Sequence, residues 1–372
     1  MKRTSGLAFS LIAVFLIWSG TANAATTHYL PRQFDPSEMG TIGMAVVNPT
    51  TTAASLTFRL QRADGSIAAI TTRSVPAKGQ LPLTLAQLFP EAQGAGWMSV
   101  DSDVDQVSGF WMGGDFVNST DGAPLLSTAN AIANPAFTFF GSTTEISLVN
   151  VGSVAVTANL NLRNAGGTRV ASRSISIPAS GLFQDSVAAL FPIDVSDFDT
   201  QGYWISVSPS DTAARLVGTS ITPVSGRDNI VVNAAYVSYT DFVFPQVVGG
   251  AIGGTNYTTV LTLTNYRTTA QTVSLTLKQA SGAAVTIEKT IPASGVLRST
   301  LRGLCVRFGG KHSWRTRAIA EGGIYSQRGN EDGIFARRCG LANSIAIVGW
   351  WICFRQVRQQ RPIVRGRVVL PA

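Results

Sequence analysis

The sequence is poor in the side chains on which many catalytic and metal sites depend. Only 13% of its 372 residues are charged, and it contains two histidines and three cysteines. His28 lies near one end and His312 near the other, so residues 29–311 contain no histidine. This excludes a histidine-based catalytic triad and a histidine-rich metal site from the central part of the chain.

Cysteine is equally restricted. The three cysteines all follow residue 304, at Cys305, Cys339 and Cys353. A body without cysteine has no thiol nucleophile and no disulfide scaffold, so its domains must be stabilised by apolar cores. No pair of carboxylates recurs in a setting typical of a glycosidase. We therefore expect a protein that is not an enzyme, with no catalytic residue, no cofactor and no bound metal.

The net charge of +8 is not a property of the whole chain. Residues 25–301 carry 14 Lys and Arg against 18 Asp and Glu, whereas residues 302–372 carry 13 against 3. The basic surplus therefore belongs to a C-terminal segment, and the body is slightly acidic. A nucleic-acid-binding domain has a basic patch or stripe on its folded surface, so we expect no nucleic-acid partner.

The first 24 residues have the three parts of a signal peptide. Two basic residues precede an apolar run at residues 7–18, and Ala22 and Ala24 form the A-x-A pattern that signal peptidase recognises. The run is shorter than the roughly 20 residues that span a bilayer, which argues against the alternative of an uncleaved anchor. The apolar stretch at residues 345–354 is also too short. We expect cleavage after Ala24, no stable membrane span afterwards, and a secreted, cell-surface or periplasmic location.

The body, residues 25–304, is built from an internal repeat. The same landmarks recur 102 residues apart between the first two copies, and 114 or 115 residues apart between the second and third. Agreement across several landmarks identifies a true repeat rather than a chance motif. The landmarks are an Asn that ends a strand (Asn48, Asn150, Asn265), the Pro of a Pro-Ala-x-Gly turn (Pro76, Pro178, Pro292) and the Leu of Leu-Phe-Pro (Leu88, Leu190).

Within each copy, apolar and polar residues alternate in short segments such as residues 56–60 and 273–277. A period of two is typical of a strand with one buried face. Turn sequences that contain glycine separate the segments, which amount to about seven strands per copy. The pattern predicts an all-β fold of tandem immunoglobulin-like β-sandwiches, with a single helical turn at residues 83–88 and again at 186–190.

The landmarks also divide the chain. After the signal peptide at residues 1–24, we expect a first sandwich over 25–127, a second over 128–238, a partial third over 239–304 and a tail over 305–372. With their Asn-ended strand, Ile-Pro-Ala-x-Gly turn, Leu-Phe-Pro and Gly-Trp strand, residues 28–304 resemble secreted bacterial repeat proteins with immunoglobulin-like modules. The resemblance implies an extracellular or cell-surface location and no catalytic role. It carries over no functional residue, because its motifs are structural turns.

The third copy stops in the middle of a domain. The step from the turn proline to the landmark leucine is 12 residues in the second copy, and in the third it leads from Pro292 to Leu304. Cys305 and Val306 then stand where the other copies have Phe-Pro, and every later landmark is missing. Two explanations compete, a genuine basic appendage and a reading-frame shift near codon 304. We favour the frameshift, because a sandwich without its last strands exposes a sheet edge and half a core.

Two tryptophans are the candidates for ligand contact. In the strands that contain Trp97 and Trp204, alternation places Met98 or Ile205 on one face and the tryptophan on the other. If the aliphatic face is the core, both rings point outward from equivalent strands, and exposed rings suit sugar stacking or protein contact. The alternative, which we favour, is that each ring packs under a neighbouring loop or the next domain.

The acidic residues 101–105 resemble the start of a calcium-binding loop. The match fails at the sixth position, Gln106, and at the twelfth, Met112. We expect a hairpin turn there, with a weak Ca²⁺ site as the alternative. A second acidic loop receives the same interpretation, at Asp194, Asp197 and Asp199.

These features together predict a non-enzymatic module of structural or adhesion type, secreted or held at the cell surface. Its expected partner is an extracellular protein or a glycan. The alternative is an exported carbohydrate-binding accessory module or hydrolase component that uses carboxylates together with Trp97 and Trp204.

The frameshift hypothesis predicts that the nucleotide sequence downstream of codon 304 encodes the missing landmarks in another frame. Translation of the other two frames is expected to yield Phe-Pro followed by a Gly-aromatic strand. If neither frame yields them, the basic tail is genuine and the frameshift explanation fails.

Overall fold

A computed structural model describes most of residues 26–304. Its gaps are residues 93, 115–119, 193–201, 225–228, 235–237, 240–242, 245–248, 253–254, 279–283 and 301–302. Beyond residue 304 it describes only three two-residue strands, β25 (Ile334–Phe335), β26 (Ile345–Ala346) and β27 (Cys353–Phe354). The signal peptide, the loop at residues 194–199 and most of the basic tail therefore lie outside the described residues.

Repeat one, residues 25–127, forms two antiparallel sheets. The first has the order β4-β3-β6-β1-β9 and the second the order β5-β2-β7-β8. The strands are β1 (Thr26–Phe34), β2 (Gly43–Val47), β3 (Ala54–Gln61), β4 (Ile67–Val75), β5 (Gln80–Thr84), β6 (Gly96–Ser102), β7 (Ser108–Gly114), β8 (Thr120–Pro124) and β9 (Leu126–Ser127). Short helical turns are η1 (Pro36–Glu38), α1 (Leu85–Leu88) and, just after the repeat, η2 (Thr128–Asn130).

Repeat two, residues 128–238, has the same arrangement. Its sheets are β10-β15-β12-β13 and β14-β11-β16-β17. The elements are β10 (Ala136–Thr138), β11 (Glu145–Asn150), β12 (Val156–Arg163), β13 (Arg169–Ile177), β14 (Leu182–Ser186), α2 (Val187–Leu190), β15 (Trp204–Pro209), β16 (Leu216–Thr222) and β17 (Ile230–Asn233).

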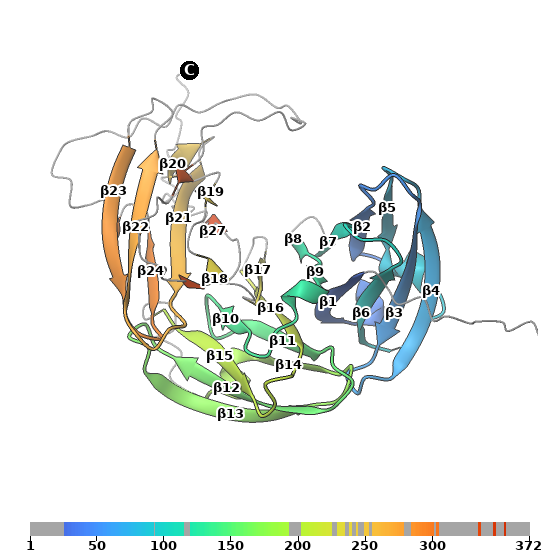
Figure 1. Ribbon diagram of the computed structural model, residues 1–372, viewed down its shortest axis with the longest axis horizontal. Coiled ribbons are helices and arrows are strands. Elements are labelled where there is room, and N and C mark those ends of the chain that lie inside the picture. Colours follow the sequence, from blue (N-terminus) through green and yellow to red (C-terminus); the bar gives the residue numbers. More distant parts are fainter. Residues whose placement is uncertain are drawn as a thin grey trace, which may run out of the picture.

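Repeat three, residues 239–304, keeps the middle strands of the same plan. β21 pairs with β24 and β22 with β23, as the second strand pairs with the fifth and the third with the fourth in the complete copies. The elements are β18 (Ser238–Tyr239), β19 (Val243–Phe244), β20 (Gly249–Ile252), β21 (Thr255–Thr264), β22 (Gln271–Lys278), β23 (Ala284–Ile291) and β24 (Val296–Thr300). The three repeats follow one another along a curve (Figure 1).

The strand order confirms an all-β fold, but it differs from the immunoglobulin order that the sequence predicted. In an immunoglobulin constant domain, strands ABED form one sheet and CFG the other. The second–fifth and third–sixth pairs of that fold recur in repeats one and two. However, the first strand here pairs with the sixth and the seventh pairs with the second. The first and seventh strands have therefore exchanged sheets, the fourth pairs with the third instead of the fifth, and an eighth strand extends the sheet of the second.

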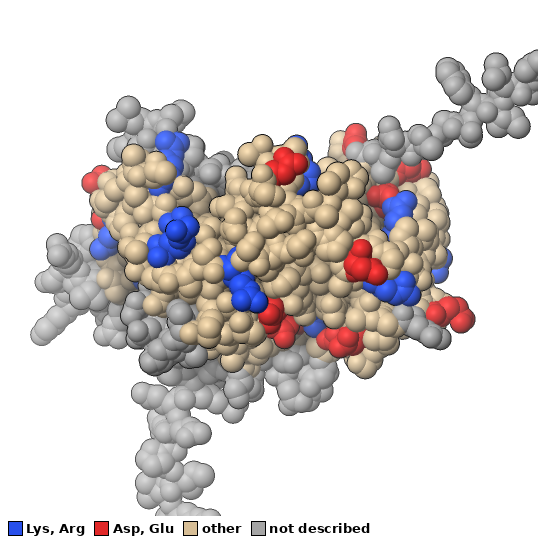
Figure 2. Space-filling model, turned by 90° about the horizontal axis from the view of Figure 1, so that it is seen from below, with Lys and Arg blue, Asp and Glu red and all other residues tan. Residues whose placement is uncertain are grey.

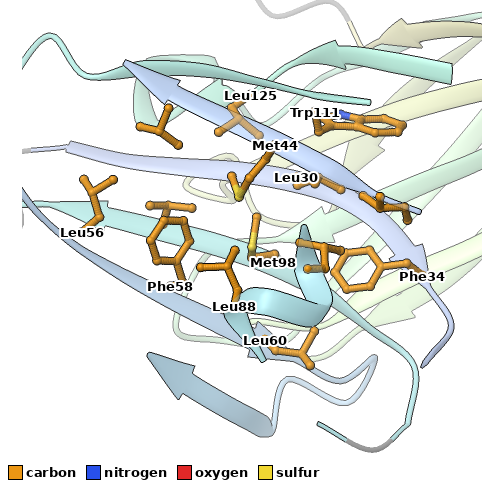
Figure 3. Packing of buried hydrophobic residues seen from close by; sticks show 14 of the residues in the cluster. Leu30, Phe34, Met44, Leu56, Phe58, Leu60, Leu88, Met98, Trp111 and Leu125 are labelled. Carbon is orange, nitrogen blue, oxygen red and sulfur yellow. The ribbon is translucent and has the colours of Figure 1, made fainter. Parts of the chain in front are cut away.

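Alternation along each strand builds the core. In β6, Met98 and Val100 point inward, and in β7 Trp111 does so, so side chains from both sheets meet between them. Figure 3 shows Met98 and Trp111 near Phe34 and Phe58 in repeat one, and Val100 belongs to the same cluster. All five are at most 1% exposed. Removing one such aromatic ring costs about 3–5 kcal/mol, so these cores stabilise the repeats without disulfides.

The repeated asparagine and the repeated proline turn are two halves of one interaction. Asn150 is 1% exposed, and its Nδ2 donates to the carbonyls of Val154 and Pro178 at 2.7 and 3.0 Å. Its Oδ1 accepts the N–H of Gly152 at 3.0 Å. Its own backbone N–H donates to the carbonyl of Gly181, the last residue of the turn. The side chain therefore fixes the end of β11 to the turn before β14.

The same set of bonds recurs in the other two copies. Asn48 donates to Thr52 and Pro76, and Asn265 donates to Thr269 and Pro292, all at 2.8–3.1 Å. The third turn residue adopts a left-handed backbone each time, with φ of 57° at Lys78, 53° at Ser180 and 51° at Ser294. A non-glycine residue in this region is uncommon and needs surrounding structure to hold it. The buried asparagine supplies that support.

The predicted helical turns are confirmed, and each is capped. Thr84 accepts the N–H of Gln87 through its hydroxyl, and Ser186 accepts that of Ala189, both at 3.2 Å. Hydroxyl caps of this kind stabilise a helix start by about 1 kcal/mol. In repeat three, Thr300 accepts the N–H of Gly303 at 3.0 Å, and Leu304 is 5% exposed within the core. The repeat plan therefore continues up to residue 304.

The asparagine interaction predicts a large loss of stability on its removal. Asn150→Ala leaves the carbonyls of Val154 and Pro178 without their buried donor, and each unpaired group costs about 1–3 kcal/mol. We expect a loss of about 3 kcal/mol in the free energy of unfolding, measured by guanidinium denaturation. Asn159→Ala, at an exposed site on β12, is the control and should change it by less than about 0.5 kcal/mol. Equal effects of the two substitutions would contradict the assigned role.

Candidate functional site

Trp97 and Trp204 have the predicted orientation, and both rings are buried, as the favoured interpretation of the sequence expected. Each lies near the start of a sixth strand, and the adjacent Met98 and Ile205 point into the cores. The two rings lie on the opposite face, yet they are only 1% and 2% exposed. The next repeat covers them, as the alternative interpretation of the sequence expected. Neither ring is therefore free to stack on a sugar.

Each indole donates a hydrogen bond to the following repeat. Nε1 of Trp97 donates to the carbonyl of Ser180 at 3.2 Å, and Nε1 of Trp204 donates to the carbonyl of Ser294 at 3.1 Å. The two acceptors are the left-handed residues of equivalent Pro-Ala-Ser-Gly turns. A buried indole N–H usually finds such a partner. The same donor and acceptor therefore close both junctions.

A backbone hydrogen bond crosses each junction beside the indole. The N–H of Leu182 donates to the carbonyl of Ala63, and the N–H of Val296 donates to the carbonyl of Ala165, both at 3.0 Å. Ala63 and Ala165 lie in the turns that join the third and fourth strands of the preceding repeat. A turn of one repeat therefore contacts a turn of the next, and the hydrogen bond between them fixes the relative position of the two repeats.

Glycine is required where these turns meet. Gly65 and Gly167 have φ of 85° and 88°, the left-handed region that favours glycine. A Cβ on Gly65 would lie 2.0 Å from the carbonyl oxygen of Ala179, and one on Gly167 would lie 1.9 Å from that of Ala293. The Asp-Gly and Gly-Gly turns of the sequence therefore serve both backbone conformation and contact between repeats.

Apolar side chains surround the hydrogen bonds at both junctions. Between repeats one and two, Tyr29 and Trp97 pack with Leu126, Val149, Leu182 and Val217. Between repeats two and three, Trp204 packs with Ala136, Val232, Val296 and Tyr266. The tyrosine ring centroids lie 6.5 Å from Trp97 and 5.2 Å from Trp204. Burial raises the pKa of the Tyr266 hydroxyl well above its usual value.

The contact is made by one sheet face against another. β1 of repeat one lies across β11, β14 and β16 of repeat two. The N–H of Gln33 donates to Oε1 of Gln184 at 3.1 Å, at one side of this contact. At the other side, Nδ2 of Asn233 donates to the carbonyl of Pro124 at 3.0 Å. The outer face of the first-strand sheet thus covers the outer face of the next repeat's second-strand sheet.

One charged cluster lies inside repeat one. Arg32 on β1 pairs with Glu38 at 2.8 Å, approaches Asp121 on β8 at 3.7 Å, and lies 5.4 Å above the ring of Trp111. The carboxylate of Asp121 is 3% exposed. Buried pairs of this kind are weak stabilisers but costly to break. The cluster links the two sheets of repeat one, because Arg32 lies in one sheet and Asp121 in the other.

The acidic segment 101–105 ends β6 and turns toward β7, but β6 and β7 lie in different sheets, so the expected hairpin is wrong and the turn crosses between the two sheets. Its carboxylates have separate partners. Asp101 forms an ion pair with Arg59 and accepts the hydroxyl of Thr27 at 2.7 Å, while Asp103 accepts the N–H of Ser55. Among the described residues, no three metal-ligating side chains of the His, Cys, Asp and Glu types come together. Asp194, Asp197 and Asp199 lie outside the described residues.

Sequence reasoning found the tryptophans but missed their partners. From the sequence, the Ala63–Gly65 turn and the Pro-Ala-Ser-Gly turn were identified only as turns that separate strands, not as contacts between repeats. One signal was present. The turn has Ser180 and Ser294 in the repeats that follow another repeat, and Lys78 in the repeat that follows none.

Comparison of the chain with protein-family models, curated proteins and solved structures finds no match. Within the described residues, none of the helices is long and apolar enough to cross a membrane. The junctions between repeats are the best-defined candidate site in the described residues.

The junction geometry predicts that Trp204 couples the unfolding of repeats two and three. Trp204→Ala removes the buried ring and its bond to Ser294, and loss of a buried tryptophan costs about 3–5 kcal/mol. We expect the main unfolding transition to split into two, observed by differential scanning calorimetry.

Trp204→Phe should give an intermediate result, because it keeps most of the apolar contact and loses only the N–H donor. Ile70→Ala, at a site 55% exposed on β4, is the control and should leave a single transition unchanged. If Trp204→Ala also leaves the transition unchanged, the junction does not couple the repeats.

Proposed function

We propose that the protein is a secreted or cell-surface, non-enzymatic spacer and adhesion-type module, whose tandem sandwiches act as one stiff, curved unit. The repeated junction is the observation that carries this proposal. Both junctions use an indole bond of 3.1–3.2 Å, a backbone bond of 3.0 Å and a glycine without room for a side chain. Interfaces within a chain are by default mobile unless they are large and apolar. Both junctions of this chain are apolar, and hydrogen bonds fix the position of one repeat on the next.

Export is proposed from the first 24 residues and from the resemblance to secreted bacterial repeat proteins. The absence of cysteine from the body is compatible with any redox compartment, because the cores do not depend on disulfides.

The partner of this module is proposed to be an extracellular protein or glycan rather than nucleic acid. Figure 2 looks from below onto one face of the molecule, and the charges on its described part are scattered and of both signs. Nucleic-acid-binding faces gather basic side chains into a patch or stripe. The alternative function, a carbohydrate-binding accessory module or hydrolase component, loses its two proposed contact residues, because Trp97 and Trp204 are buried.

Small-angle X-ray scattering of the exported protein tests the stiffness. We expect a single curved arrangement of the repeats to fit the profile, and the N-terminal sequence of the same sample to begin at Ala25. Trp97→Ala should increase the radius of gyration and require several arrangements, because it opens the first junction.

The control is Ile70→Ala, which should scatter like the unmodified chain. A profile of the unmodified chain that requires many repeat orientations would sink the spacer proposal. Glycan-array binding by the unmodified protein that survives Trp97→Ala and Trp204→Ala would instead support sugar recognition by another surface.

A further inference from the structure

Repeat one exposes the face that the other repeats bury. In repeats two and three, the outer face of the sheet built on the second strand is covered by the preceding repeat. Val149, Val217 and Thr219 on this face of repeat two are at most 1% exposed. By strand register, Val149 corresponds to Val47 of repeat one and Thr219 corresponds to Phe110. Val47 and Phe110 are 38% and 46% exposed.

We call this exposed surface the β2–β7 face and define it by six residues. They are Ala45 and Val47 on β2, Phe110 and Met112 on β7, Pro82 on β5 and Pro124 on β8. Register places Ala45 and Pro124 on either side of Phe110, and Ala45 opposite Pro82. Trp111 and Val46 point to the core between them. These six side chains are apolar and none of them is charged.

This face is not shaped to receive another repeat of the same kind. At the first junction, the indole of Trp97 from repeat one packs against Leu182 and Val217 of repeat two and donates a hydrogen bond to the carbonyl of Ser180. The equivalent positions of repeat one hold Gln80, Ser108 and Lys78. All three are polar and one is charged, so the place where a preceding tryptophan would pack is unfavourable. Terminal units of repeat arrays carry such polar substitutions as caps.

In repeat one the large apolar side chains of this face lie at the opposite end from Gln80 and Ser108. Thr219 and Ile221 of repeat two correspond by register to Phe110 and Met112. At the junctions the aromatic ring comes from the preceding repeat, as Trp97 or Trp204, whereas the β2–β7 face has an aromatic ring of its own, Phe110. Phe110 and Met112 are 46% and 41% exposed. Exposed apolar patches of this kind mark interaction surfaces.

We propose that the β2–β7 face binds the same face of a second copy of this chain, forming a two-fold dimer. A two-fold interface sets one patch against itself, so it requires a self-complementary surface. The six residues that define this face meet the requirement, because none of them is charged and their packing brings no like charges together. Sheet-on-sheet packing is already the way in which this protein joins its repeats, and sheets pack face to face at about 10 Å. In the dimer, Phe110 and Met112 of each copy fill the space that the indole fills at the junctions.

The mass of the mature chain in solution tests the dimer. Sedimentation velocity over a concentration series, in reducing buffer so that the cysteines beyond residue 304 form no cross-link, should show a monomer–dimer equilibrium. Phe110→Asp sets two carboxylates against each other across the two-fold axis and should weaken dimerisation at least 100-fold. Met112→Asp, on the same face, should act in the same way.

Ile70→Asp is the matched control, because Ile70 is an exposed aliphatic residue on β4 of the other sheet. It should leave the dimer intact. Circular dichroism of each variant establishes that it is folded, which is expected because both target side chains are exposed. A monomer at every concentration, or a dimer unaffected by both Phe110→Asp and Met112→Asp, overturns the proposal. The stiffness of the repeat array is measured separately and does not depend on this outcome.

Discussion

The structure depends on one buried asparagine in each repeat. Asn48, Asn150 and Asn265 are at most 1% exposed and bind the carbonyl of the proline in the turn that follows the fourth strand. An unpaired amide in the interior costs about 1–3 kcal/mol, so the side chain and the turn require each other. This explains why the Asn and the Pro-Ala-x-Gly landmarks recur together although 28 residues separate them in the first two copies.

The contact between repeats is built on that turn. Because the asparagine holds it from inside, its third residue can keep a left-handed backbone and present its carbonyl outward, where the tryptophan of the preceding repeat binds it. The fold of a single repeat thereby provides the docking point for its neighbour. In repeat one, Lys78 has the same backbone conformation without a preceding repeat, and its side chain folds back to the carbonyl of Pro49. The same turn geometry therefore occurs both where a preceding tryptophan binds the turn and where none does.

Much of the fold is visible in the sequence because it follows from local patterns. Alternation identifies the strands, glycine-containing turns separate them, and the two helical turns lie within the expected ranges 83–88 and 186–190. Strand order is not visible in the same way. Alternation reports which face of a strand is buried but not which strand lies beside it, so the exchange of the first and seventh strands between sheets emerged only in three dimensions.

The candidate site shows the same division. The sequence by itself determined that Trp97 and Trp204 lie on the face opposite Met98 and Ile205, because side chains alternate along a strand. Only the tertiary structure decided whether that outer face meets solvent or another repeat. Burial of the indoles depends on turns 83 and 90 residues away, and contacts at such separations leave no trace in local periodicity. The chain alone thus establishes the repeats and their inward and outward faces, while the packing of one repeat on the next decides which outward faces remain open.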